Sequence, residues 1–162
     1  MTADKSHEQP HPDRRDLDAF ESALSGGLQS AIFHLNRLTP HRFTGVFRFD
    51  GEMLRSVALV DKWAPDVTRG DDLPIANAYC AHLHSTGQPL EVHDGASDPR
   101  TGWMRDAPFR SYSGAVIYAP DGSLWGALCH FDEKPCDEAT SSLPLLLSAA
   151  GRLYPCAADV AA

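Results

Sequence analysis

The chain has 162 residues, of which 43% are hydrophobic and 9% aromatic. This length fits one folded domain, and the composition excludes a largely disordered protein. A net charge of -8, from 22 acidic against 14 basic residues, would repel a phosphate backbone and argues against nucleic acid as a direct partner. No apolar stretch approaches the roughly 18 residues of a membrane span, and the first residues lack the apolar segment of a signal peptide. We therefore expect a cytoplasmic protein without membrane contact.

The N-terminal part predicts a helix after a disordered leader. Residues 1–14 are polar and rich in His, Pro and Asp, with nothing to bury. From Leu17 to Leu38, apolar residues recur at steps of three and four, which predicts one long amphipathic helix that ends before Pro40. The glycine pair at residues 26–27 offers this helix a bend or a close neighbour.

The next segment changes to the period of a β-strand. Alternating aromatic residues from Phe43 to Phe49, followed by Asp50-Gly51, predict a β-hairpin. Pro74 fits the first turn of a short helix over 75–86, which Gly87 closes. A brief strand over 88–94 follows.

The C-terminal half predicts a long loop, a second hairpin and a last helix. Residues 95–108 combine turn formers and charges, so we expect a loop with one helical turn, and loops of this length are usually functional or mobile. Residues 112–132 form a hairpin with its tip at 120–122. A final helix over 138–154 is apolar around most of its circumference and needs cover on two sides, and residues 156–162 are expected to form a disordered tail. Hairpins interspersed with helices predict an α+β fold with an antiparallel sheet.

Two stretches carry a family resemblance. "NAYCAHLHSTGQPLEVHDGASDPRTG" and "FRSYSGAVIYAPDGSLWGALCHFDEKP" resemble the motifs of GAF domains in order and spacing. The resemblance covers the domain that we place at residues 15–155. It implies a central antiparallel sheet of five or six strands, with the first and last helices on one face. The middle helix and the long loop would cover the other face and enclose a small molecule.

The sequence departs from the subfamilies whose ligands are known. The cysteine settings of bilin-binding members and the late motif of cyclic-nucleotide-binding members are missing. The free methionine-R-sulfoxide reductases resemble this chain in length, but the stretch that corresponds to their cysteine loop contains no cysteine here. The ligand, and any cofactor, therefore stays unknown.

The cysteines and histidines are the side chains of this sequence with the most reactive chemistry. Cys80, Cys129, Cys136 and Cys156 stand singly, which favours structural free thiols over a disulfide framework or zinc ribbon. Because side chains alternate along a strand, Leu124 and His130 are expected on one face, and Trp125, Cys129 and Phe131 on the other. Cys129 and His130 therefore cannot cooperate directly, and core packing is favoured for Cys129.

The candidate ligand site combines the middle helix, the long loop and the second hairpin. Cys80 and His84 share a helix face, although a metal site would need further ligands that the sequence does not assure, so we predict none. His130 is predicted beside Tyr112, at the pocket or hydrogen-bonded inside the sheet. The loop arginines suit carboxylate or phosphate, or they hold local turns, Asp98 with Arg100 and Arg110 with Asp94 or Asp106. The candidate ligand-binding residues are Tyr79, Cys80, His84, His93, Asp98, Arg100, Trp103, Arg110, Tyr112 and His130.

Three functions fit these observations. The first is a sensory module that binds a small organic ligand and signals through its first and last helices, as a homodimer or through a separate effector protein. The second is a thiol-dependent enzyme like the sulfoxide reductases, with Cys80 as nucleophile but no convincing second cysteine. The third is an interaction module without a ligand. We favour the first, which is not an enzyme.

Overall fold

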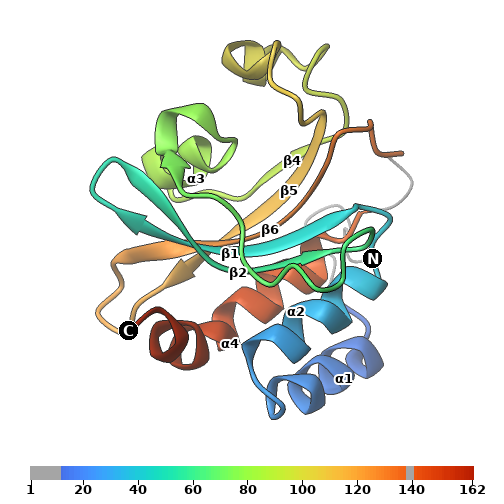
Figure 1. The fold of residues 1–162 in the computed structure, drawn as a ribbon, viewed down its shortest axis with the longest axis vertical. Helices are drawn as coiled ribbons and strands as arrows, with labels where there is room; N and C mark the ends of the chain where they lie inside the picture. The colour runs from blue at the N-terminus through green and yellow to red at the C-terminus, as the bar shows by residue number, and fades with distance from the viewer. Residues whose placement is uncertain (1–11, 138–140) are drawn as a thin grey trace, which may run out of the picture.

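The centre of the computed structural model is a curved antiparallel sheet (Figure 1). The structure describes residues 12–137 and 141–162. The strands are β1 (Phe43–Asp50), β2 (Met53–Asp61), β3 (Leu73–Pro74), β4 (Leu90–Val92), β5 (Ser111–Tyr118) and β6 (Leu124–Asp132). They form a six-stranded sheet in the order β3-β2-β1-β6-β5-β4. The predicted α+β fold is therefore confirmed.

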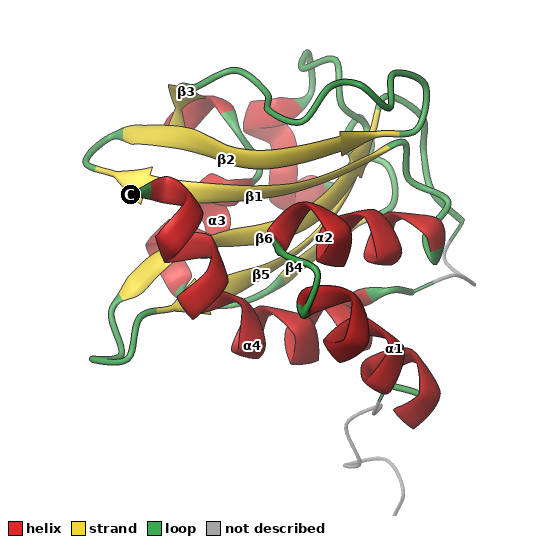
Figure 2. Cartoon of the chain, turned by 60° about the horizontal axis from the view of Figure 1, so that its bottom comes forward, coloured by secondary structure: helices red, strands yellow, loops and turns green. Residues whose placement is uncertain are grey.

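Helices cover both faces of this sheet. The α-helices are α1 (Arg14–Leu24), α2 (Leu28–Arg37), α3 (Cys80–Thr86) and α4 (Leu143–Ala161), and two 3₁₀ helices are η2 (Ile75–Asn77) and η3 (Pro99–Met104). Helices α1, α2 and α4 pack on one face, and α3 lies on the other with η2 and η3 (Figures 1 and 2). This is the arrangement of first and last helices that the resemblance implied. None of the helices in the described part of the chain has the length and apolar character to cross a membrane.

Both hairpins form where the turn residues predicted them. Strands β1 and β2 meet at Gly51, and β5 and β6 are joined through Gly122, with φ values of 59° and 85° at these glycines. Residues with a Cβ rarely adopt this left-handed conformation, so glycine fixes the position of each turn.

The first helix is broken, which corrects the prediction of one helix over 17–38. Gly27 has a φ of 110° and lies at the N-cap of α2, so the chain leaves α1 at Ser25 and starts a new helix. Helix α1 also begins earlier than expected, at Arg14, because Asp13 caps it by accepting a hydrogen bond of 2.8 Å from the Arg15 N–H. The rest of the predicted leader, residues 1–11, lies outside the described residues.

The last helix is shifted toward the C-terminus. Helix α4 begins at Leu143 and continues through Pro155 to Ala161, so the disordered tail predicted at 156–162 is wrong for residues 156–161. The reason is burial: Ala157 is fully buried against the same core as Leu146 and Leu153. The start predicted at Glu138 lies outside the described residues.

The sheet separates two cores. One core lies between the sheet and α1, α2 and α4, and includes Phe20, Ile32 and Leu146. The cover that the apolar last helix needed on a second side comes from α1 and α2. The second core lies between the sheet and α3 and includes Tyr79, Leu83 and Tyr112.

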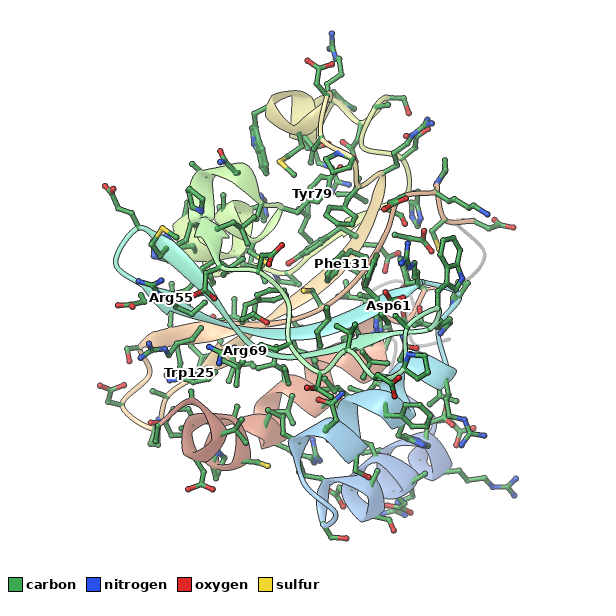
Figure 3. All side chains as sticks on the ribbon, viewed as in Figure 1. Arg55, Asp61, Arg69, Tyr79, Trp125 and Phe131 are labelled. Atoms are coloured by element: carbon green, nitrogen blue, oxygen red, sulfur yellow. The ribbon has the colours of Figure 1, made fainter. Side chains whose placement is uncertain are left out.

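A β-bulge in β6 changes which residues share a face. The pairing of β5 with β6 shifts between Ile117 and Tyr118, so that Ile117 pairs with Gly126 and Tyr118 with Leu124. Trp125 therefore packs in the helix-side core and Phe131 in the opposite one (Figure 3). The predicted alternation holds from Gly126 onward and fails at Leu124 and Trp125, because the extra residue inverts it.

Candidate functional site

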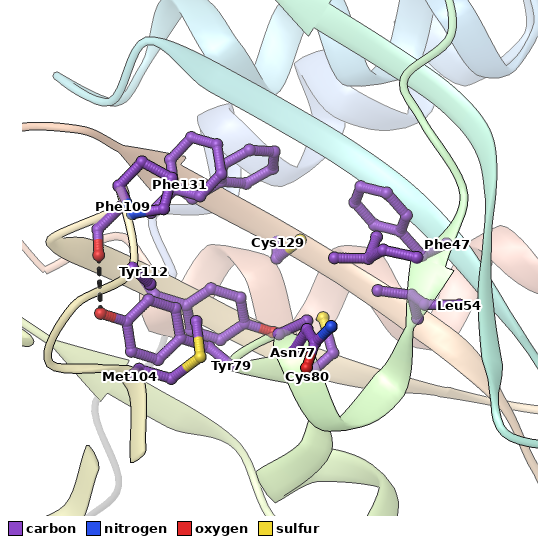
Figure 4. A pocket seen from close by; sticks show the side chains of 14 residues that line it. Phe47, Leu54, Asn77, Tyr79, Cys80, Met104, Phe109, Tyr112, Cys129 and Phe131 are labelled. Atoms are coloured by element: carbon purple, nitrogen blue, oxygen red, sulfur yellow. Dashed lines mark hydrogen bonds between the residues drawn. The ribbon is translucent and has the colours of Figure 1, made fainter. Parts of the chain in front are cut away.

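A cavity of about 200 Å³ lies in the second core, between the sheet and the segment of residues 95–110 (Figure 4). Strands, α3 and this segment all contribute to its wall. The lining residues are Phe47, Leu54, Leu73, Asn77, Ala78, Tyr79, Cys80, Met104, Ala107, Pro108, Phe109, Tyr112, Cys129 and Phe131. The wall is almost entirely apolar or aromatic and contains no Asp, Glu, Lys, Arg or His side chain.

Two glycines flank Cys129, the cavity-lining residue of β6. Gly45, Cys129 and Gly114 are paired across β1, β6 and β5. A Cβ on Gly114 would lie 2.2 Å from the Tyr112 hydroxyl oxygen, and one on Gly45 would lie 2.7 Å from the Phe47 ring. Each glycine thus lets the ring two residues away lie over its own strand, and Cys129 lines the cavity from β6, between the two strands.

The segment of residues 95–110 forms the roof of the cavity, and polar contacts fix it to the sheet and to the start of α3. The Tyr79 hydroxyl donates a hydrogen bond of 2.8 Å to the Phe109 carbonyl (Figure 4). The Gly95 N–H donates to the Arg110 carbonyl at 2.6 Å, and the Arg110 guanidinium binds the Asp94 carboxylate at 2.8 Å. This ion pair lowers the pKa of Asp94. The predicted loop is therefore a structured roof.

The polar groups inside the cavity are two thiols and a phenol. The Tyr112 hydroxyl lies 3.1 Å from the Cys80 sulfur and over Gly114, the cross-strand partner of Cys129. Burial raises the pKa of both Tyr112 and Cys129. Hydrogen bonds from Cys129 and then Tyr112 lower the pKa of Cys80 despite its burial.

Residues 26–153 match the family model described as the GAF domain. The chain belongs to the GAF domain family. Domains of this family generally bind small molecules. A search of curated proteins finds no significant match.

Solved structures share the fold of this GAF domain at low sequence identity. The GAF domain of an Acinetobacter phosphoenolpyruvate-protein phosphotransferase is 13% identical with a TM-score of 0.66, and 91% of each chain is covered. Free methionine-R-sulfoxide reductase from Neisseria meningitidis is 16% identical with a TM-score of 0.66, covering 94% of this chain and 98% of that one. The chromophore-binding domain of Stigmatella aurantiaca phytochrome P1 is 14% identical with a TM-score of 0.62, covering 92% of this chain and 61% of that one.

Three of the predicted ligand residues line the cavity of the GAF domain: Tyr79, Cys80 and Tyr112. The other loop and helix candidates lie outside its lining. His84 packs on Phe49 with ring centroids 4.8 Å apart, and the half-exposed Trp103 lies 6.0 Å from the Tyr79 ring.

The charged candidates are held by local partners. The His93 ring lies 3.5 Å from a Glu91 carboxylate oxygen. The Arg100 guanidinium lies 2.7 Å from the Asp98 carboxylate, whose other oxygen accepts the Arg100 N–H. The local pairs expected for this loop, Asp98 with Arg100 and Asp94 with Arg110, are both present.

His130 does not lie beside Tyr112, which corrects the predicted register. Tyr112 pairs with Phe131 and Ser113 with His130, so His130 points to the opposite face. There its ring nitrogen lies 2.6 Å from the Thr44 hydroxyl. The expected separation of Cys129 and His130 onto opposite faces is confirmed by their contacts.

Most residues of the cavity wall were not among those predicted from the sequence. Phe47 and Phe131 could have been found, because the predicted alternation already placed each on one face of its hairpin. Met104 and Phe109 carried no signal, since nothing in a loop sequence tells which side chains turn inward. Within the described residues, no group of three or more His, Cys, Asp and Glu side chains lies close enough to hold a metal ion.

Proposed function

We propose that this GAF domain is a sensory module that binds a small, uncharged, mainly apolar molecule of about one ring. The observation that carries the proposal is the cavity of about 200 Å³ walled by aromatic and aliphatic side chains. A cavity of about 150 Å³ accommodates benzene, which sets the scale of a fitting ligand.

Charge supports an uncharged ligand. No Asp, Glu, Lys, Arg or His side chain lines the cavity, and an isolated charge placed there would lose its hydration without an oppositely charged partner. The arginines of the roof segment that could bind an anion, Arg100 and Arg110, are paired with Asp98 and Asp94. One polar group on the ligand has partners in the Asn77 amide and the thiol and phenol groups of Cys80 and Tyr112.

The test is ligand binding by a cavity-filling variant and its matched control. A panel of phenols, indoles, cyclic nucleotides and tetrapyrroles is screened by thermal shift, and hits are confirmed by calorimetry. A ligand at about a hundredfold above its Kd adds about 2.7 kcal/mol to stability. Ala78→Leu fills the cavity, whereas Ala76→Leu changes a neighbouring exposed residue outside the lining.

The expected result is that single-ring uncharged compounds bind the wild type and Ala76→Leu, and bind Ala78→Leu at least tenfold more weakly. Binding only of anionic or tetrapyrrole compounds, or equal affinity in both variants, would overturn the proposal.

We also infer that the output leaves through α1 and α4 as a homodimer of this chain. Leu147 and Val160 support this inference, because they are 41% and 52% exposed on α4. Light scattering after size exclusion should give a dimer that Leu147→Glu dissociates. A monomer at tens of micromolar in the wild type would point instead to a separate effector protein.

A further inference from the structure

Two of the four cysteines meet in the cavity from different elements. Cys80 is the first residue of α3, and Cys129 lies in β6, near the centre of the sheet. Both side chains line the cavity, and the residues are only 2% and 1% exposed. The Tyr112 hydroxyl lies between them, because it is 3.1 Å from the Cys80 sulfur and lies over Gly114, the cross-strand partner of Cys129. Both are free thiols. Two buried thiols that face one cavity beside the same hydroxyl are a starting arrangement for a disulfide.

The surroundings of the two sulfurs differ. The Cys129 thiol has the Gly45 carbonyl as a partner, at 3.8 Å. A carbonyl only accepts, so this contact favours the protonated form of Cys129. The Tyr112 hydroxyl lies 3.1 Å from the Cys80 sulfur and is able to donate to it, and such a hydrogen bond stabilises a thiolate. Cys80 is therefore the nucleophile of the pair, and Cys129 is placed to resolve it.

We propose that Cys80 and Cys129 form a redox-active dithiol that a hydroperoxide converts into a disulfide. The Cys80 thiolate attacks one peroxide oxygen and the O–O bond breaks, which gives a sulfenic acid and, after protonation of the leaving oxygen, water or an alcohol. The Cys129 sulfur then attacks the Cys80 sulfur, the S–O bond breaks, and the Cys129 proton leaves with the hydroxide as water. The two thiols lose two electrons in total, and the peroxide gains them.

The linkage would change the cavity. In a disulfide the two sulfurs lie about 2.04 Å apart, so formation of the bond draws the start of α3 toward β6. Helix α3 is the part able to move, because it has only seven residues, whereas β6 is paired on both sides. Oxidation should then weaken ligand binding, a consequence that rests on the proposed function, whereas the disulfide itself does not.

The experiment treats the full chain, reduced and folded, with hydrogen peroxide, alkylates the remaining thiols, and maps the peptides by mass spectrometry. The expected product is a Cys80–Cys129 peptide pair lighter by two hydrogens and restored by dithiothreitol. Cys156→Ser, which removes a thiol outside the cavity lining, should form the same link. Cys129→Ser should instead accumulate a Cys80 sulfenic acid that dimedone traps.

The wild-type peptide map decides whether the disulfide forms. Recovery of Cys80 and Cys129 as separate alkylated peptides after peroxide, while Cys136 or Cys156 is oxidised, would overturn it. So would dimedone labelling of Cys129 in a Cys80→Ser variant at the rate found for Cys80. The peptide map detects a covalent bond and needs no ligand. A failed ligand screen therefore does not contradict the disulfide proposal, and a missing disulfide does not contradict the ligand-binding proposal.

Discussion

At the scale of single residues, the most unusual feature is a buried pair of histidines. His41 and His130 stack with ring centroids 5.6 Å apart on the helix side of the sheet. Each ring receives a hydroxyl contact of 2.6 Å, His41 from Thr39 and His130 from Thr44. The Asn36 side chain completes the group by donating to the Thr44 hydroxyl at 2.9 Å. Both rings are thus held neutral in a satisfied polar network.

This pair predicts that stability falls in mild acid. Burial lowers the pKa of His41 from 6.5 to about 4, with Lys62 and His93 adding to the effect and Asp132 opposing it, and burial lowers that of His130 well below 6.5. The unfolded chain therefore binds protons first, so stability is complete above pH 6.5 and declines as pH falls toward 4. His41 alone should cost about 2 kcal/mol between pH 7 and pH 5.

Urea unfolding at pH 7 and pH 5 measures this loss. In His41→Gln the difference between the two pH values should shrink by about 2 kcal/mol, whereas His82→Gln, at a partly exposed position outside the histidine pair, should keep the wild-type difference. An equal pH dependence in the wild type and His41→Gln would show that the buried ring is not the cause.

The sequence predicted local ion pairs between side chains, but not which side chains line the cavity. The sequence identified Asp94 and Asp98 as partners for Arg110 and Arg100, because turn chemistry is local. It could not choose between these pairs and a bound anion, since that choice depends on the wall of the cavity. Both arginines are paired and the cavity lining has no charged residue, which supports the uncharged ligand proposed above.

At the scale of elements, prediction succeeded where one residue fixes a backbone conformation. Gly51, Gly87 and Gly122 all have a positive φ and end the elements that were predicted to end there. It failed where two conformations suit the same residues: the apolar period continues across Gly26 and Gly27, although the chain starts a second helix there. The bulge at Trp125 likewise leaves no mark in the sequence, because it depends on the register with β5.

The close packing of β1 and β6 gives a sharp prediction. A Cβ on Gly126 would lie 2.0 Å from the Phe47 carbonyl oxygen, and backbone in the middle of a sheet cannot yield. Gly126→Ala should therefore lower the free energy of unfolding by about 3 kcal/mol, the upper end of typical overpacking costs. Gly102→Ala is the matched control, because nothing lies within 4 Å of its added Cβ and its φ is not left-handed.

Denaturant unfolding of both variants checks this prediction. A loss of less than about 1 kcal/mol in Gly126→Ala would mean that the two strands separate at little cost, contrary to the tight pairing described above.

At the scale of the whole molecule, one sheet separates two cores, and the cavity described above lies in the core on the α3 side. The helix-side core is filled by aliphatic side chains from three helices, whereas the other contains glycines and aromatic rings that leave a space. The family motifs predicted the two layers, but the cavity wall joins residues from β1 to β6 that no local pattern links. That wall therefore had to come from the three-dimensional structure.

Because the two cores lie on opposite faces of one sheet, we expect substitutions in them to lower the free energy of unfolding additively. Ile32 in α2 and Ile75 in η2 are buried in different cores, on opposite faces of the sheet. Each change to valine should cost roughly 0.5–1.5 kcal/mol, and the double variant should lose the sum within about 0.5 kcal/mol in a single unfolding transition. A roof layer that unfolds on its own would instead give Ile75→Val a second transition and make the costs non-additive. A single transition would mean that the two layers unfold together. A ligand bound in the cavity would then also stabilise the helices on the other face, as the proposed sensory function requires.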